Sequence, residues 1–305
     1  FKTFCLRFEK YPVNIELLCR ITSKKNQEKI IKGLKIGKTE IIIGTHRLLS
    51  EDIDLRQSRE LAAKIGFDYI ECAFSILAAM PDEDYQRLLA RKDAFPIPVS
   101  KANLFLPGDI TPIGPDASER AQREYLDRAF ARAHAIGVKL VVFGSGRARK
   151  VPEGWSYARA WRQLTDFLDV AAEYALKYDV VIALEPLRSV ECNLLNYVTE
   201  ATALCGIVNH PYITVLGDTF HMLSGHEPLE SLTKAGEKLS HVHISHTLPD
   251  MSKRILPRSG DGENYAEYIN LLKDMNYAGD ISIEAWDNDL ENEGRAAVEC
   301  IKPLL

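Results

Sequence analysis

The sequence has few of the features that mark secreted or membrane-spanning proteins. Its six cysteines include no C-x-x-C pair, which argues against a disulfide framework and against a thiolate zinc site. No apolar run approaches the roughly 18 residues that a membrane span needs. The first residues also lack the pattern of a signal peptide. We therefore expect a cytoplasmic protein without a membrane partner.

Motifs for ATP chemistry are missing as well. The chain contains neither a G-x-x-x-x-G-K-[ST] phosphate loop nor a D-E-x-H box, so it lacks the lysine and the metal-holding acid that ATP chemistry needs. The composition, with 46% hydrophobic and 27% charged residues, is ordinary for a folded protein and excludes disordered or collagen-like chains. A chain of 305 residues forms either two domains or one large α/β domain.

Charge is distributed unevenly along the chain. Residues 1–50 carry a net charge of +7 and the remaining residues carry −12, which gives −5 for the whole chain. A basic segment joined to an acidic body indicates a nucleic-acid-binding arm, a partner-binding face, or two pieces of different origin. The acidic body argues against nucleic acid as a partner, because phosphate backbones bind basic surfaces.

Short apolar runs alternate with longer amphipathic patterns after residue 55. The runs are residues 69–74, 97–106, 139–143, 179–184, 213–216, 240–244 and 280–283. Between them, apolar residues recur at three- and four-residue steps, as in residues 161–176, which predicts helices. Apolar strands joined by helices predict a parallel sheet. With residues 40–44 as an eighth strand, we predict an α/β fold of the (β/α)8 TIM barrel type; an open, doubly wound sheet is the alternative.

Polar residues at the ends of four predicted strands favour the barrel. These residues are Glu185, Asp218, His243 and Glu284. In barrel enzymes the carboxyl ends of the strands meet at one face, where the catalytic residues lie. A charged strand end at the solvent boundary would explain any one of them, but four at equivalent positions weaken that explanation. Three carboxylates and one imidazole suit a single divalent ion such as Mn²⁺, Mg²⁺ or Co²⁺, with Zn²⁺ as the alternative.

Several segments after residue 55 resemble the sugar phosphate isomerase/epimerase superfamily of xylose-isomerase-like barrels, which includes the ketose 3-epimerases. The segments are VFGSGRARKVPEGW, IALEPLRSVECN, VLGDTFHM, HVHIS and ISIEAW, and the resemblance covers about residues 55–305. The resemblance implies one metal ion whose ligands are Glu185, Asp218, His243 and Glu284. It also implies that Glu191 and His221 touch oxygen atoms of the substrate.

These residue types support an isomerase that acts on a small sugar or sugar phosphate. A divalent ion bound to a ketose carbonyl and the adjacent hydroxyl acidifies the neighbouring C–H bond and stabilises an enediolate. Glu185 and Glu284, on opposite sides of the sugar, would then remove and return the proton. Return to the opposite face gives epimerisation, and return to the neighbouring carbon gives isomerisation. The sequence does not distinguish epimerisation from isomerisation. It is also compatible with a homo-oligomer.

One position departs from the resemblance. The epimerases carry an arginine six residues after the metal-binding histidine, where this chain has Pro249. Either Arg254 or Arg258, from the insertion-like stretch, supplies the positive charge near the substrate, or the substrate differs from that of the epimerases. Glu71 and Asn103, at the ends of two other predicted strands, are further candidates for substrate contacts.

The first fifty residues resemble a different family. The segment YPVNIELLCRITSKKNQEKIIKGLKIGKTEIIIGTHRLLSEDI resembles the helicase core of transcription-repair coupling factor. We predict a strand at 12–18, a helix at 23–34 and a strand at 40–44. Two parts are therefore expected: a helicase-like fragment over 1–38 and the barrel over 39–305. In this interpretation residues 40–44 replace the missing first strand of the barrel and cover its open edges.

Three other functions are compatible with these patterns. A lyase of the inosose or dehydroshikimate dehydratase type would use the same barrel, metal and enolate chemistry. An endonuclease-IV-like enzyme would need further zinc ligands and a basic DNA face, which the acidic body opposes. The third is a barrel without catalysis that carries a nucleic-acid-binding arm. We favour the isomerase.

Overall fold

Strands and helices alternate along the chain in the computed structural model, which describes residues 15–18, 41–44, 55–94, 96–286 and 289–305. The strands are β1 (Ile15–Leu18), β2 (Ile41–Gly44), β3 (Ile70–Ala73), β4 (Val99–Asn103), β5 (Leu140–Phe143), β6 (Val181–Leu184), β7 (Ile213–Asp218), β8 (Leu239–Ile244), β9 (His246–Thr247), β10 (Arg254–Ile255) and β11 (Asp280–Ile283). The helices are α3 (Leu55–Ile65), α4 (Phe74–Ala79), α5 (Asp82–Ala90), α6 (Glu119–Ile136), α7 (Tyr157–Tyr178), α8 (Val198–Val208), α9 (Thr219–Ser224), α10 (Ser231–Ala235), α11 (Tyr265–Asp274) and α12 (Leu290–Ile301). All seven strands expected after residue 55 are present.

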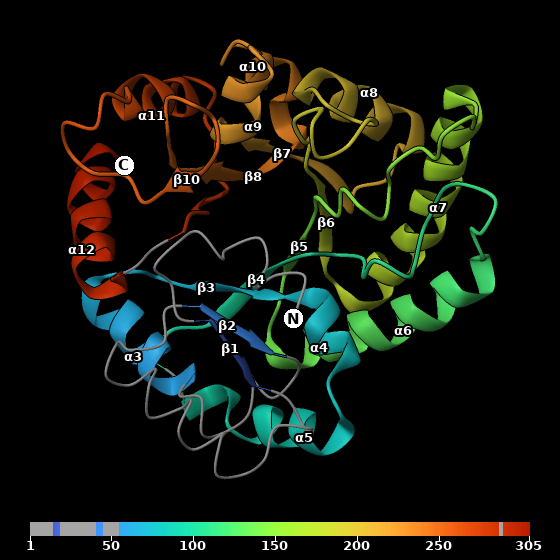
Figure 1. The fold of residues 1–305 in the computed structure, drawn as a ribbon, viewed down its shortest axis with the longest axis horizontal. Coiled ribbons are helices and arrows are strands. Elements are labelled where there is room, and N and C mark those ends of the chain that lie inside the picture. The colour runs from blue at the N-terminus through green and yellow to red at the C-terminus, as the bar shows by residue number, and fades with distance from the viewer. Residues whose placement is uncertain (1–14, 19–40, 45–54, 95, 287–288) are drawn as a thin grey trace.

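Seven strands form one curled parallel sheet, in the order β11-β8-β7-β6-β5-β4-β3. Helices lie around the outside of this sheet (Figure 1). The two end strands approach each other. The hydroxyl of Tyr69, directly before β3, lies 2.7 Å from Oγ of Ser282 in β11. The predicted α/β barrel is therefore confirmed, and the open sheet is excluded.

Alternation along the strands separates two apolar cores. Val141, Phe143, Ile182 and Leu184 face outward into the large core beneath the helices. Leu140, Val142, Ala183 and Leu216 face inward and form a second, smaller core. Glu185 and Asp218 continue the inward alternation at the carboxyl ends of β6 and β7. The strand period alone therefore directs these two carboxylates to the mouth of the barrel.

The ends of α6 show how local sequence sets the helix boundaries. The side chain of Ser118 accepts a hydrogen bond from the backbone N–H of Ala121 and so caps the start of the helix. Gly137 follows the last turn with φ of 102°, in the left-handed region that glycine adopts without strain. Gly137 therefore ends α6 shortly before β5 begins.

The strand expected to complete the barrel lies elsewhere. β2 pairs in parallel with β1, with Ile15 opposite Ile41, and the two form a separate two-stranded sheet. The prediction that residues 40–44 replace the first barrel strand is therefore wrong. Both strands are apolar and come from the same N-terminal segment, so pairing with each other satisfies their backbone groups without the barrel. A boundary between residues 38 and 39 would divide this sheet, and the helix expected at 23–34 lies outside the described residues.

The described part of the barrel is one strand short between β3 and β11. No described strand pairs with the outer edge of either, and we call this space the β3–β11 gap. A cavity of about 430 Å³ occupies it, lined by both edge strands and by side chains of the flanking helices such as Ala62 and Val298. Side chains that face into the barrel connect the two sides of the β3–β11 gap, in place of hydrogen bonds between backbones. Lys101 Nζ, for example, lies 2.5 Å from Asp280 Oδ2.

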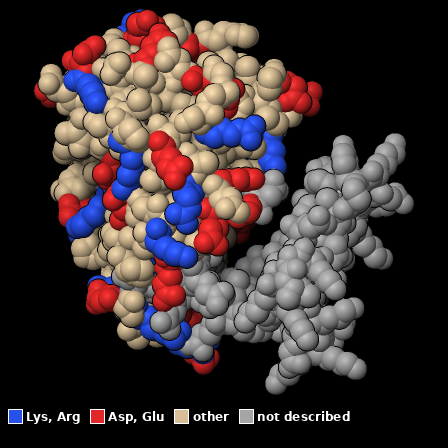
Figure 2. All heavy atoms as spheres, turned by 90° about the vertical axis from the view of Figure 1, so that its left-hand side faces the viewer, with Lys and Arg blue, Asp and Glu red and all other residues tan. Residues whose placement is uncertain are grey.

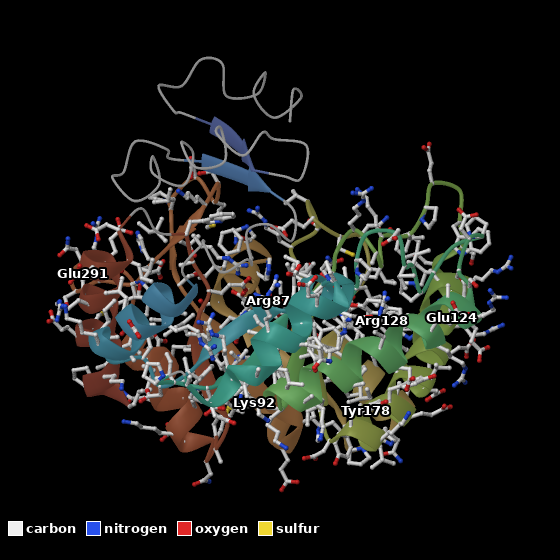
Figure 3. The ribbon with its side chains drawn as sticks, turned by 90° about the horizontal axis from the view of Figure 1, so that it is seen from below. Arg87, Lys92, Glu124, Arg128, Tyr178 and Glu291 are labelled. Carbon is white, nitrogen blue, oxygen red and sulfur yellow. The ribbon has the colours of Figure 1, made fainter. Side chains whose placement is uncertain are left out.

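The outer surface carries charges of both signs. Lys64 of α3 pairs with Glu291 of α12 at 3.5 Å, and Figure 3 shows Glu291 at the rim of the molecule. Figure 2 faces the side on which α12 lies, and the coloured residues there mix basic and acidic side chains. Nucleic acid binding favours a surface of uniform positive charge, which this view does not show among the coloured residues. Within the described residues, no helix combines the length and apolar character needed to cross a membrane.

Candidate metal centre and active site

Four side chains singled out in the sequence meet at the carboxyl ends of the strands. They are Glu185, Asp218, His243 and Glu284, and we call them the ligand cluster. One ligand atom of each lies within 4.8 Å of those of the others. His243 Nδ1 is central to the group, at 2.7 Å from Glu284 Oε2 and 3.4 Å from Glu185 Oε1. The curl of the sheet thus brings together residues that are up to about a hundred positions apart.

The unpartnered atoms of the ligand cluster fit a cation. Glu185 Oε1, His243 Nδ1 and Glu284 Oε2 are buried and make no well-formed hydrogen bond among the described residues, although His243 Nδ1 and Glu284 Oε2 lie only 2.7 Å apart. A buried polar atom without a partner costs about 1–3 kcal/mol, and a shared cation would remove this cost for all three. Three oxygen donors and one nitrogen donor also suit divalent ions such as Mn²⁺. The residues present therefore fit a divalent cation.

The carboxyl groups of the ligand cluster differ in acidity. Burial raises the pKa of Glu185, although hydrogen bonding with His243 acts in the opposite direction. Burial acts on Asp218 in the same way, but electrostatic interaction with His221 and Arg254 holds its pKa well below its ordinary value. Asp218 is therefore suited to be a permanently charged ligand, and Glu185 to take up and release a proton.

The backbone around Glu185 is built to hold its carboxylate in place. A Cβ atom on Gly144, at the end of β5, would lie 2.1 Å from Glu185 Oε2, so only glycine leaves room there. The fully buried guanidinium of Arg149 donates hydrogen bonds to the carbonyl oxygens of Phe143 and Glu185. Arg149 therefore ties the ends of β5 and β6 together. No pattern in the sequence distinguished this buried arginine from a surface charge.

His221 lies beside the ligand cluster. Its Nε2 is 3.9 Å from both Glu185 Oε1 and Asp218 Oδ2. Its Nδ1 accepts a hydrogen bond from the backbone N–H of Arg188 at 3.3 Å, which leaves Nε2 to carry the proton of a neutral ring. Asp218 fixes the same region, because its side chain accepts a hydrogen bond from the backbone N–H of Phe220 at the start of α9.

The positive charge at the site comes from Arg254. The inserted stretch forms an antiparallel hairpin of β9 and β10, and Arg254 begins the second strand. One guanidinium nitrogen lies 2.6 Å from Asp218 Oδ2 and the other lies 2.9 Å from Glu284 Oε1. The guanidinium also packs over the ring of Phe220, 5.1 Å from its centre. Arg254 thus neutralises two members of the ligand cluster.

The structure does not bring Arg258, the other candidate, to the ligand cluster. Arg258 is exposed, and its backbone N–H donates a hydrogen bond to the side chain of Asp261. The hairpin explains the difference, since β10 directs Arg254 toward the strand ends, whereas Arg258 lies in the loop beyond it. Of the two arginines, Arg254 is therefore the one that reaches the ligand cluster.

The remaining predicted substrate contacts occupy three different places. Glu191 is exposed, and its Oε1 lies 2.5 Å from Nε of Arg188. Asn103, at the end of β4, is half-buried and lines the same cavity as Glu71 and Glu284. Glu71 meets His243 at the ring nitrogen that faces away from the ligand cluster. Neither Glu191 nor Glu71 belongs to the ligand cluster itself.

Known proteins resemble the chain in two separate parts, the larger of which is the barrel. A family model described as a xylose isomerase-like TIM barrel matches residues 59–304. The L-ribulose 3-epimerase of Methylomonas sp. (strain DH-1) is 28% identical over 131 residues, which cover 43% of this chain and 44% of that protein. The solved structure of a D-allulose 3-epimerase from Methylomonas sp. has a TM-score of 0.70 and 23% identity, and the match covers 82% of this chain and 91% of the other.

The N-terminal part resembles an unrelated protein. The transcription-repair-coupling factor of Bacillus subtilis (strain 168) is 51% identical over 53 residues, which are 17% of this chain and only 4% of that protein. The predicted resemblance of the first fifty residues is therefore confirmed. This chain spans a small fraction of that relative and less than half of the L-ribulose 3-epimerase.

Proposed function

Because the chain belongs to the xylose isomerase-like TIM barrel family, we propose that it is a sugar epimerase or isomerase that depends on one divalent metal ion. The observation that carries the proposal is the ligand cluster, in which one ligand atom from each of four side chains lies within 4.8 Å of the others and three of these side chains have a buried ligand atom. The names of the similar proteins, an L-ribulose 3-epimerase and a D-allulose 3-epimerase, support ketoses as the substrate class.

Two carboxylates of the ligand cluster are suited to proton transfer. A divalent ion held by the cluster would supply Lewis-acid polarisation of the ketose carbonyl, which acidifies the adjacent C–H bond. Glu185 removes this proton, and burial strengthens it as a base by raising its pKa. Glu284, which reaches the site from β11 and is only half-buried, returns a proton from the other side.

Two cationic or hydrogen-donating groups are suited to binding substrate oxygen atoms. His221 directs Nε2 toward the ligand cluster at a distance that leaves room for a small ligand atom. Arg254 carries a fixed positive charge at the same mouth and stabilises negative charge that develops on the enediolate. His221 belongs to α9, and Arg254 belongs to β10.

A substrate panel with defined metal loading tests the proposal. The full chain is stripped with a chelator, loaded with Mn²⁺, Mg²⁺, Co²⁺ or Zn²⁺, and incubated with ketoses and ketose phosphates. We expect an epimer or an aldose as product, loss of activity on chelation, and no product from Glu185→Gln or Glu284→Gln. The exposed Glu153→Gln is the matched control and should remain active. Release of water from the substrate would indicate a dehydratase instead, and cleavage of abasic DNA would indicate a nuclease.

A further inference from the structure

A carboxylate whose side chain is 12% exposed lies at the second nitrogen of the central histidine. Glu71 Oε1 is 3.3 Å from Nε2 of His243, whereas Nδ1 of the same ring faces the ligand cluster. His243 and its neighbour His241 are both buried, and their rings meet edge to face. The imidazole of His243 thus joins the ligand cluster to Glu71.

The hydrogen atoms around Glu71 can be assigned from its partners. Ser282 donates its hydroxyl hydrogen to Glu71 Oε1 at 2.6 Å, so the Tyr69 hydroxyl must donate to Ser282 in turn. His241 Nε2 lies 2.7 Å from the same Glu71 oxygen. A carboxylate oxygen that faces several donors is an ionised acceptor. The nitrogen of His243 that faces it, Nε2, therefore carries a hydrogen atom.

We propose that Glu71 is a positioning residue of the metal centre, which binds the Nε2 hydrogen of His243 and so presents Nδ1 to the ligand cluster. This inference rests on the proposed function, because it concerns the same metal ion. A carboxylate that accepts a hydrogen bond from a metal-binding imidazole fixes the ring orientation and increases the basicity of the other nitrogen. Glu71 therefore acts on the metal ion through His243 and not on the substrate directly.

A second metal ion at Glu71 explains the geometry less well. Glu71, His241 and His243 also have ligand atoms within 4.8 Å of one another. However, Glu71 Oε1 already accepts a hydrogen bond from the hydroxyl of Ser282 at 2.6 Å. A second ion would also require His243 to bind through both nitrogens and to lose both ring hydrogens.

The same network also has a structural role that the experiment must separate. Tyr69 and Ser282 connect β3 to β11 across the β3–β11 gap, and Glu71 takes part through Ser282. Tyr69→Phe removes the hydroxyl that crosses the gap but leaves the carboxylate at His243. This variant is therefore a matched control for a purely structural effect.

Metal affinity of the full chain tests the inference. Calorimetric titration with Mn²⁺ compares the wild type with Glu71→Gln, Glu71→Ala and Tyr69→Phe, and the melting temperature of each metal-free protein is recorded. We expect the dissociation constant to rise by about 10- to 100-fold in the two Glu71 variants, as for other partners of metal-binding histidines. It should stay unchanged in Tyr69→Phe. The visible spectrum of bound Co²⁺ should change only in the Glu71 variants.

Three results would overturn the inference. The first is equal affinity in the wild type and both Glu71 variants, and the second is equal weakening in Tyr69→Phe in step with its melting temperature. The third is two ions per wild-type chain, falling to one in Glu71→Ala, which would make Glu71 a ligand. If the wild type binds no ion, the proposed function fails together with the inference. Normal binding by the wild type with unaffected Glu71 variants removes the inference alone.

Discussion

The central histidine of the ligand cluster controls the proton balance of the site. Burial opposes a charged ring, yet Glu71 and Glu284 hold the pKa of His243 well above its ordinary value. These two carboxylates therefore favour the protonated ring, and a cation that binds at Nδ1 competes with the hydrogen there.

Metal binding should consequently depend on pH. Because the bound proton competes with the ion at His243, the affinity should rise as pH increases from 6 to 8, with release of about one proton per ion near pH 7. Calorimetry in buffers of different ionisation enthalpy measures the released proton directly. An affinity that stays constant over this range, without any buffer dependence, would contradict the assignment of His243 as a ligand.

A glycine at the end of β5 provides a steric test of Glu185. Gly144→Ala places a Cβ atom where Glu185 Oε2 lies, so the carboxylate must shift by an ångström or more. Misplacement of this size lowers turnover by about 100-fold. Gly206→Ala, at an open position in α8, is the matched control and should keep full activity. Steady-state kinetics that show the same turnover for both variants would contradict the role of Glu185.

Among the elements, the hairpin of β9 and β10 has the clearest energetic role. It directs Arg254 at Asp218 and Glu284, which would otherwise be like charges facing each other in the metal-free site. Arg254→Met should destabilise the metal-free protein by about 3 kcal/mol, the usual cost of removing one partner from a buried ion pair. Mn²⁺ should reduce this loss, because the ion supplies positive charge to the same carboxylates.

Urea unfolding with and without Mn²⁺ measures this effect. The expected result is a large difference between the wild type and Arg254→Met without the ion and a small difference with it. Equal destabilisation under both conditions would show that Arg254 and the ion do not share carboxylates.

Elements with strong local signals could be predicted from the sequence, and long-range contacts could not. The apolar runs predicted the seven strands after residue 55. The alternation of side chains along these strands then indicated that Glu185 and Asp218 lie at the mouth of the barrel. The hairpin of β9 and β10 has only two residues per strand and no apolar periodicity. The contact of Arg254 with the ligand cluster depends on how β10 pairs with β9, which the sequence does not show. The contact of Glu71 with Ser282 joins residues 211 positions apart and exists because β3 and β11 approach each other.

The whole molecule combines a barrel with a separate two-stranded sheet. The sequence correctly predicted a strand at residues 41–44. It could not identify the partner strand, because an apolar strand can pair with β1 or with an edge strand of the barrel. All seven barrel strands and the whole ligand cluster lie after residue 55. The described N-terminal strands contribute no residue to the ligand cluster.

Removal of the N-terminal part should therefore leave the site intact. A chain that begins at residue 55 should bind Mn²⁺ with the affinity of the full chain and convert the same substrate at the same rate. Titration and kinetics on both chains compare these values. A truncated chain that stays folded by circular dichroism but no longer binds the ion would show that the N-terminal part supplies a portion of the site.

Uptake of deuterium from solvent is the most direct measurement of the central claim, which is proton transfer by Glu185 and Glu284 on a metal-bound ketose. The Mn²⁺-loaded protein is incubated in deuterium oxide with each ketose and ketose phosphate, and the recovered sugar is examined by NMR. We predict incorporation at a single carbon next to the carbonyl, and no incorporation with Glu185→Gln or after chelation. A protein that binds one ion per chain but exchanges no C–H bond in any of these sugars would contradict the account.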